Sequence, residues 1–242
     1  MLFRSNYFEG CSNLNLTAND APDLTSTTNL EWAFSFCDNL GSSGNMSKWD
    51  VSSVTDMSYM LSHAKSFNQD TSMWDVSSVT NMGWMFAFAH SFNQDISGWD
   101  VSNVTNMAGL FCAAYSFSQD IGSWDVSNVI SMRFLFDSTN SFNQGIGEWN
   151  VSKVTDMGWM FGRADNFNQD IGEWDVSNVG DMGNMFYGAY TFNHDIGGWN
   201  VSSVTDMSEM FYSADAFNQA IGGWNVSSVT DISWMFNGAT AF

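Results

Sequence analysis

The sequence predicts an α/β repeat solenoid, with one short parallel strand and one short helix in each 25-residue coil. Three observations support this prediction: a strict repeat, a segment with helical spacing and a segment with alternating side chains. One tryptophan marks each repeat, at Trp49, Trp74, Trp99, Trp124, Trp149, Trp174, Trp199 and Trp224. Periods of about 20–50 residues are typical of stacked units, which share one continuous core because no unit buries its apolar side alone.

The predicted helix lies in the middle of each repeat. Within one repeat, the apolar residues Met57, Met60, Leu61, Ala64 and Phe67 follow the spacing of a single helix face. The segment has room for only about three turns. A short α or 3₁₀ helix is therefore expected in every coil.

The predicted strand begins at the tryptophan of each repeat. Trp74 and Val76 alternate with polar residues, as in a strand that buries one face. The spacing of Ile96, Trp99 and Val101 also matches the L-x-x-L-x-L strand of leucine-rich repeats. We therefore expect a leucine-rich-repeat-like coil whose strands pair in parallel, about 4.8 Å apart.

The repeats divide the chain into two regions of one continuous array. Residues 1–48 are predicted to be degenerate N-terminal repeats, and residues 49–242 to be tandem 25-residue repeats, seven complete and one truncated. No linker or change of composition separates them. We recognise no signal peptide and no apolar stretch long enough to span a membrane, and we expect the sequence to be a segment of a longer protein.

The repeat motif W-[D/N]-V-S-x-V-T-[D/N]-M, continued by M-F-x-x-A-x-x-F-N-Q-D-I, resembles the BspA-type leucine-rich repeats of bacterial, mycoplasmal and protist surface proteins. The 25-residue form is similar to the mycoplasma lipoprotein-type repeat of unknown function. The resemblance covers residues 49–242 closely and residues 8–48 loosely. It implies display at a cell surface and, for some members, adhesion to a host matrix, and it supplies no catalytic residue.

The charge of the chain restricts its partners. Six Lys and Arg residues stand against 26 Asp and Glu residues, which gives a formal net charge of −20. Nucleic acid and anionic membrane surfaces are therefore disfavoured as partners, because both require dense cationic contacts. A charge of this sign attracts cations or basic partners and keeps a long array in solution.

Polar residues also recur at fixed positions. Asp or Asn follows each tryptophan, as at Asp75 and Asn150, and a serine such as Ser77 stands two residues further on. Turn formation is the favoured interpretation. Calcium binding is the alternative, although no calcium-loop motif is present. Repeated serines without a neighbouring His or Lys base are not activated nucleophiles. We expect no catalytic residue, no metal ion and no cofactor, and predict that the protein is not an enzyme.

Two features leave their alternatives open. Cys11 and Cys37 occupy one repeat position in adjacent coils, and a disulfide or two buried free thiols suit that spacing equally well. Sequons of the Asn-x-Ser/Thr type, such as that of Asn103, arise from the repeat itself and are therefore a weak signal of glycosylation.

One variable position of the repeat carries aromatic residues. It holds Gly, Asn or Glu in three repeats and an aromatic residue in five, at Tyr59, Trp84, Phe134, Trp159 and Trp234. A core position would not tolerate Asn or Glu, so we expect this column to be exposed. Exposed Trp and Tyr residues are typical of interface hot spots, and packing against a neighbouring coil is the alternative. We predict that these five residues form a partner-binding surface.

Together these observations predict a non-enzymatic extracellular or cell-surface scaffold that binds a protein or extracellular-matrix partner, as an adhesin does. One alternative is a structural stalk or filament-forming unit that self-associates end to end through exposed edges. A further alternative is ice or crystal binding through Ser/Thr columns such as that of Thr55, Thr80 and Thr105.

Overall fold

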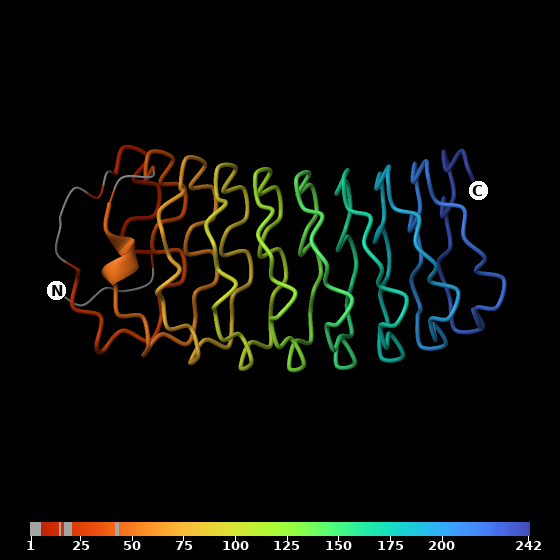
Figure 1. Cartoon of the computed structure of the whole chain (residues 1–242), viewed down its shortest axis with the longest axis horizontal. Coiled ribbons are helices and arrows are strands. Elements are labelled where there is room, and N and C mark those ends of the chain that lie inside the picture. Colours follow the sequence, from red (N-terminus) through yellow and green to blue (C-terminus); the bar gives the residue numbers. More distant parts are fainter. Residues whose placement is uncertain (1–5, 15, 17–20, 42–43) are drawn as a thin grey trace.

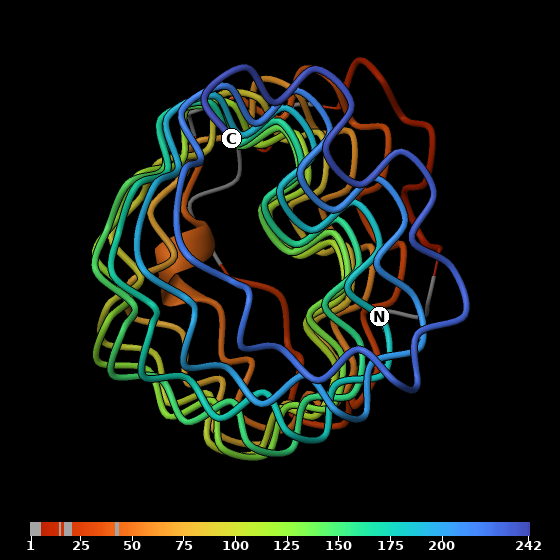
Figure 2. The ribbon, with the colours of Figure 1, turned by 90° about the vertical axis from the view of Figure 1, so that its right-hand side faces the viewer.

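In the computed structural model, the coils of the repeat lie side by side along one axis, from the N-terminal end to the C-terminal end (Figure 1). Viewed along that axis, successive coils largely superimpose (Figure 2), so equivalent repeat positions form columns that run along the stack. The structure describes residues 6–14, 16, 21–41 and 44–242. The open centre of the ribbon is filled by the buried side chains of the core.

The predicted α/β architecture, with a helix and a strand in each leucine-rich-repeat-like coil, is wrong. The only helix in the described part of the chain is the 3₁₀ helix η1, Met46–Lys48. No extended strand occurs among the described residues either, and the coils are joined at isolated parallel bridges that link Asn29, Asp56, Asn81, Asn106, Ser131, Asp156, Asp181, Asp206 and Asp231 in succession. The stack is therefore a series of turns, with one bridge and further backbone hydrogen bonds between each coil and the next.

The segment that was predicted to be helical is a run of tight turns. Tyr59 and His63 have φ angles of 56° and 60°, in the left-handed region, whereas an α-helix needs φ of about −63° at every residue. Met60 N–H donates to Met57 O over 3.1 Å, which closes a four-residue turn. Successive turns of this kind give apolar residues a spacing of three and four, which periodicity alone cannot distinguish from a helix.

The backbone donors between these turns bond to the next coil. Met57 N–H donates to Asn81 O over 3.0 Å, and Leu61 N–H donates to Met85 O over 3.0 Å. Donors therefore alternate between the local turn and the neighbouring coil. This alternation satisfies the backbone without a helix, so the intrahelical bonds that the sequence pattern predicts are not needed.

The segment that was predicted to be a strand also contains a turn. Val79 N–H donates to Val76 O over 2.8 Å, and this turn ends the extended run that begins at Trp74. Thr80 N–H then donates to Thr55 O of the preceding coil over 2.9 Å. The coils meet again at the adjacent bridge, so parallel pairing is reduced to one residue per coil.

The core consists of stacked apolar columns, as the sequence predicts. Trp124 is 4% exposed, and its ring is parallel to that of Trp99 with the centroids 6.5 Å apart. Its indole N–H donates to Ile96 O over 3.2 Å, which satisfies the one polar atom of the ring. Phe92 and Phe117 stack in the same way at 5.9 Å. Rings of neighbouring coils thus cover one another's faces.

Acidic residues and serines close turns, which confirms the favoured interpretation of these polar columns. Asp75 Oδ1 accepts hydrogen bonds from the backbone N–H of Ser77 over 3.1 Å and from its hydroxyl over 2.6 Å. The equivalent hydrogen bonds from Ser102 hold the pKa of Asp100 below its ordinary value. The carboxylate oxygen therefore acts as an acceptor for turn donors.

The predicted N-terminal region is joined to the stack with a change of spacing. The bridge from Asn29 to Asp56 spans 27 residues, whereas the following bridge from Asp56 to Asn81 spans 25. The two additional residues lie between Leu40 and Trp49, in the segment that contains η1. Residues 1–5, 15, 17–20 and 42–43 of this region lie outside the described residues.

The two N-terminal cysteines are free thiols in this structure. Cys11 is exposed and Cys37 is buried. The Cys37 thiol donates to Phe8 O over 3.1 Å. Burial raises the pKa of Cys37 to about 11, so its thiol stays protonated and unreactive near neutral pH.

Candidate functional site

Aromatic side chains form a row outside the core, which we call the aromatic strip. It consists of Trp32, Tyr59, Trp84, Phe134, Trp159, Tyr187, Tyr212 and Trp234. From Trp32 to Tyr212, neighbouring rings lie 4.0–6.2 Å apart between centroids, and Trp234 lines a pocket with Tyr212. The structure therefore brings all five predicted partner-binding residues into one row.

The backbone turns the strip residues away from the core. Tyr59, Trp84, Phe134, Trp159 and Trp234 all have φ between 56° and 60°. The left-handed conformation costs a residue with a side chain roughly 1–2 kcal/mol, and bulky residues rarely adopt it. Glycine would fit this position without that cost. The conformation belongs to the repeat position, since Asn184 and Glu209 of the same column also have φ angles of 60° and 54°.

Gly109 is the one glycine in this column, and the strip continues across it. A Cβ atom at Gly109 would lie 2.4 Å from the ring of Trp84. The indole therefore covers the space of the missing side chain. It reaches Phe134, two coils from its own, with the ring centroids 5.6 Å apart. The small residue thus lets the strip pass over a coil that lacks an aromatic residue.

A second apolar cluster lies beneath this part of the strip and is separate from the main core. Its buried members are Ala87, Cys112 and Ala113, and Trp84 and Phe134 pack against it. Burial raises the pKa of Cys112 to about 12, so this thiol is protonated at neutral pH, and it donates a hydrogen bond to Asp137 Oδ2 over 3.7 Å. Trp84 and Phe134 therefore pack on apolar residues that are separate from the main core.

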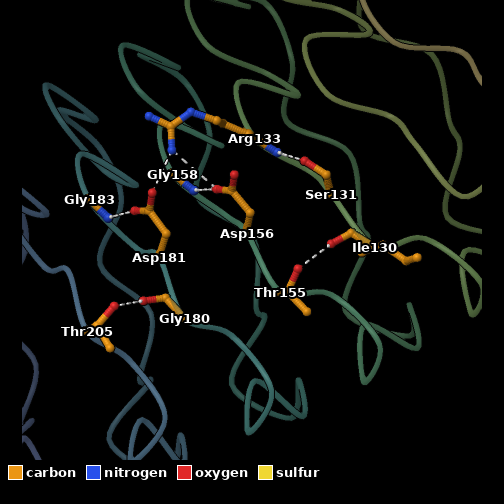
Figure 3. Close-up of polar contacts among 10 residues, drawn as sticks. All are labelled: Ile130, Ser131, Arg133, Thr155, Asp156, Gly158, Gly180, Asp181, Gly183 and Thr205. Atoms are coloured by element: carbon orange, nitrogen blue, oxygen red, sulfur yellow. Dashed lines mark hydrogen bonds and ion pairs between the residues drawn. The ribbon is translucent and has the colours of Figure 1, made fainter. Parts of the chain in front are cut away.

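Arginine side chains lie over two rings of the strip. The guanidinium carbon of Arg133 is 5.0 Å from the centroid of Phe134. The same guanidinium reaches across the next two coils, where Nη1 lies 3.4 Å from Asp156 Oδ1 and 2.6 Å from Asp181 Oδ2 (Figure 3). Two neighbouring carboxylates of one column thus share a cation, which offsets their mutual repulsion.

Arg163 is held between an aromatic ring and a carboxylate. Its guanidinium carbon is 5.2 Å from the centroid of Trp159, and its Nη2 donates to both carboxylate oxygens of Asp137, over 3.0 and 2.8 Å. Burial raises the pKa of Asp137, while the hydrogen bonds from Arg163 act in the opposite direction. The Arg163 guanidinium thus lies against a ring of the strip and also provides the cationic partner that the buried Asp137 carboxylate needs.

The C-terminal end of the strip forms an open pocket. Tyr187, Glu209, Tyr212 and Trp234 line it. Tyr187 and Tyr212 stack with their centroids 4.8 Å apart, and Trp234 is 63% exposed. No hydrogen bond or ion pair joins the Glu209 carboxylate to any other described residue. An unpaired carboxylate thus stands among three aromatic rings.

Three members of the strip lie outside the five residues predicted to bind a partner, although the sequence also marks Tyr187 and Tyr212 as exposed aromatic residues of a neighbouring column. Trp32 stacks on Tyr59 at 4.0 Å, and its position 27 residues earlier, in the degenerate region, was the available signal. Tyr187 and Tyr212 occupy a different repeat position from the predicted column. Only the turn geometry shows that the strip passes from one column to the other after Trp159, whose ring centroid lies 5.1 Å from that of Tyr187.

The hydroxyls of the Thr column that begins at Thr55 are engaged within the protein. Thr155 Oγ1 donates to Ile130 O over 3.3 Å, and Thr205 Oγ1 donates to Gly180 O over 3.1 Å (Figure 3). These bonds join adjacent coils at the positions beside the bridges. The hydroxyl donors of the Thr column are thereby directed at the backbone of the preceding coil, so the column has a structural task.

One Ser–His hydrogen bond lies next to the strip. Ser62 Oγ is 3.0 Å from His63 Nδ1, but Ser62 is only 2% exposed and a substrate cannot reach its hydroxyl. His63 lies between the rings of Phe36 and Phe88, 4.3 Å from each, and burial lowers its pKa. Within the described residues no group of three or more His, Cys, Asp and Glu side chains is placed to hold a metal ion.

Comparison with known proteins gives a family and no relative of known structure. The family model described as "Mycoplasma protein of unknown function, DUF285" matches the chain four times, over residues 4–117, 28–149, 89–180 and 131–242. The overlapping matches confirm the tandem repeat. Neither a curated protein nor a solved structure matches the chain. In the described part of the chain, no helix has the length and apolar character that crossing a membrane requires.

Proposed function

We propose that this chain, which belongs to the family of mycoplasma proteins of unknown function, is a surface scaffold. In this proposal the scaffold is not an enzyme and binds a protein partner. The observation that carries the proposal is the aromatic strip. Its rings lie outside the main core, six of the eight in the left-handed conformation, and Trp84 and Phe134 pack on a separate apolar cluster. Trp and Tyr side chains of this kind contribute most of the binding energy at protein interfaces.

The first three rings of the strip, those of Trp32, Tyr59 and Trp84, favour a protein partner over a glycan. Trp32 and Tyr59 are almost parallel, at an interplanar angle of 4°, and so are Tyr59 and Trp84. Stacked rings cover each other's faces and present their edges to solvent. A sugar needs an open ring face, whereas protein side chains also pack against ring edges. Edge-on aromatic rows therefore suit an interface with another protein.

The location is proposed from the repeat motif. The motif resembles BspA-type leucine-rich repeats, whose members are mostly displayed at cell surfaces, and the family match is to a mycoplasma repeat family. We therefore place the scaffold outside the cell and propose extracellular-matrix proteins as the first partners to test. The strongly acidic chain favours partners that carry positive charge.

Replacing two central rings tests the proposed surface. The double variant Trp84→Ser and Trp159→Ser removes edges that lie outside the core, and we expect it to weaken binding to a matrix protein by about 2 kcal/mol or more per ring. The measurement is binding of purified matrix proteins to the immobilised chain. The matched control replaces two exposed apolar residues away from the strip, Met73→Ser and Ile130→Thr, and should bind as the wild type does.

The outcome also distinguishes a binding surface from an extended core. If the folded double variant binds every partner of the wild type with unchanged affinity, the interface is not the strip. If the double variant unfolds, single replacement of Trp234, which is 63% exposed, still tests the surface without touching buried packing.

A stalk or filament-forming unit is the second candidate. The coils stack along one axis (Figure 1), and backbone N–H groups of each coil donate to the next, as those of Glu209 and Phe211 do to Ser233 and Met235. An elongated stack of this kind suits a spacer, and backbone pairing between coils is also the contact through which two chains could associate.

Exposed apolar side chains also occur in the last coil, at Val226, Ile232, Trp234 and Phe242. Sedimentation velocity over a range of protein concentrations tests end-to-end association. Replacing Ile232 by Lys should abolish it if the last coil is the contact. A strictly monomeric protein at high concentration would exclude this candidate. Ice or crystal binding stays a prediction that the engaged Thr hydroxyls do not favour.

A further inference from the structure

The protein contains its own example of how the strip binds a cation. The guanidinium of Arg163 lies 5.2 Å from the ring centroid of Trp159 and donates to the carboxylate of Asp137 over 2.8 Å. A ring on one side and a carboxylate on the other is the environment that desolvated guanidinium groups favour. Here the cation comes from the chain itself.

The pocket at the C-terminal end of the strip offers the same chemistry without a cation. Tyr187, Tyr212 and Trp234 supply the rings, and Glu209 supplies the carboxylate. Glu209 is half-buried and has no cationic partner among the described residues. A cation that enters the pocket would meet a carboxylate beside aromatic rings, the same two groups that the guanidinium of Arg163 contacts.

The charge of the surrounding coils favours such a ligand. Residues 164–242 contain ten Asp and Glu residues and no Lys or Arg. All the arginines that lie over strip rings therefore belong to the preceding coils. The acidic coils attract a basic partner over a distance, and the pocket then provides a specific contact for one of its side chains.

We propose that the pocket of Tyr187, Glu209, Tyr212 and Trp234 binds an arginine side chain of a basic partner protein. This inference rests on the proposed function, because the pocket is one end of the aromatic strip. Arginine is favoured over lysine, since the planar guanidinium stacks on rings and donates to both oxygens of a carboxylate, whereas the ammonium of lysine is a more strongly hydrated point charge.

A labelled hexa-arginine peptide tests the proposal directly. Its binding to the whole chain is followed by fluorescence anisotropy at constant salt, with hexalysine as the comparison. We expect Glu209→Gln and Trp234→Ala each to weaken hexa-arginine binding about tenfold or more. The matched control is Asp195→Asn, which changes the net charge equally and keeps the oxygen that accepts the Gly197 N–H over 2.9 Å.

The control decides between a pocket and general attraction. A loss of less than about twofold for Asp195→Asn, beside a tenfold loss for Glu209→Gln, supports the pocket. Equal losses for the two variants would show that only net charge matters and would overturn the proposal. Tighter binding of hexalysine than of hexa-arginine, or no binding of hexa-arginine to the wild type, would overturn it as well.

The pocket and the proposed function fail in different ways. If the Trp84 and Trp159 double variant keeps all its partners while hexa-arginine still depends on Glu209, the strip is not the interface and the pocket stands. If the double variant loses its partners while Glu209→Gln changes nothing, the strip stands and the arginine pocket is wrong.

Discussion

The stacked tryptophans show how much a single side chain contributes to this fold. Trp124 packs its ring against that of Trp99 and also satisfies its indole N–H at Ile96 O. Burial of a large ring and satisfaction of its polar atom act together, because an unsatisfied donor in the core would cancel part of the gain.

Replacement of Trp124 by alanine should therefore be costly. We expect Trp124→Ala to lower the free energy of unfolding by roughly 3–5 kcal/mol, as large aromatic truncations in cores do. Urea denaturation followed by circular dichroism measures the change. Trp234→Ala is the control, and because that ring is 63% exposed we expect a loss below about 1 kcal/mol. Equal losses for the two variants would contradict the core assignment.

The buried acid Asp137 should give stability an unusual pH dependence. Burial raises its pKa above the ordinary value of 3.8. Between pH 3.8 and the raised pKa, the folded protein keeps a proton that the unfolded chain has released. The contribution of Asp137 is therefore full below that window and is lost as the pH rises through it. As the pH rises through this window, the free energy of unfolding of the wild type should therefore fall relative to that of the Asp137→Asn variant.

A turn carboxylate provides the opposite case. The hydrogen bonds from Ser102 lower the pKa of Asp100, so its contribution is present above pH 3.8 and is lost as the pH falls through the lowered pKa. Urea denaturation at several pH values, with Asp137→Asn and Asp100→Asn each compared to the wild type, measures both signs. The same sign for both variants would show that the environment of Asp137 is misread.

At the scale of the element, each coil depends on left-handed residues at fixed positions. One such column contains His63, Phe88, Ser213 and Gly188, with φ between 52° and 61°. The turns exist because alternate N–H groups bond to the next coil. The cost of the left-handed residues is offset by these bonds and by the apolar side chains that the turns direct into the core.

In this column, the change in stability on substitution should depend on whether the new residue tolerates a left-handed φ angle, and not on the contacts of its side chain. Gly188→Ala meets no atom closer than 3.5 Å but must adopt a φ of 61°, so we expect a loss of about 1 kcal/mol. Ser213→Gly, at a φ of 52°, should instead leave stability unchanged or raise it by less than about 1 kcal/mol. Thermal denaturation of both variants checks the pair, and a stabilising Gly188→Ala would disprove the turn geometry.

At the scale of the whole molecule, the stack combines a net charge of −20 with columns of carboxylates one coil apart. Arg133 joins two of these carboxylates, and hydrogen-bonded turns engage many others. Long arrays of this kind remain stable because each coil needs only its neighbours.

Removal of divalent cations should leave the stack intact. Because the carboxylates act as turn acceptors, we expect EDTA to shift the melting temperature little. A ligand that binds only the folded state raises its stability, so a large fall in melting temperature that Ca²⁺ reverses would show that the calcium alternative is right. Differential scanning calorimetry with and without EDTA makes the measurement.

Some of this molecule follows from the sequence alone. The spacing of the tryptophans determines the repeat, and the apolar columns identify the core, because both depend only on which residues recur at one interval. Asn and Glu in the column of Tyr59 also identify a position outside the core, since burial would leave their polar groups unpaired.

The tertiary structure decided what local patterns could not. Met57, Met60 and Leu61 have helical spacing, yet their backbone follows turns because N–H groups that a helix would use bond to the next coil instead. The same turns direct Tyr187 and Tyr212 beside Glu209 and Trp234, although they stand at different repeat positions. Hydrogen bonds between coils link residues 24 or more positions apart, so no local window of the sequence contains the interaction that sets the backbone or assembles the pocket.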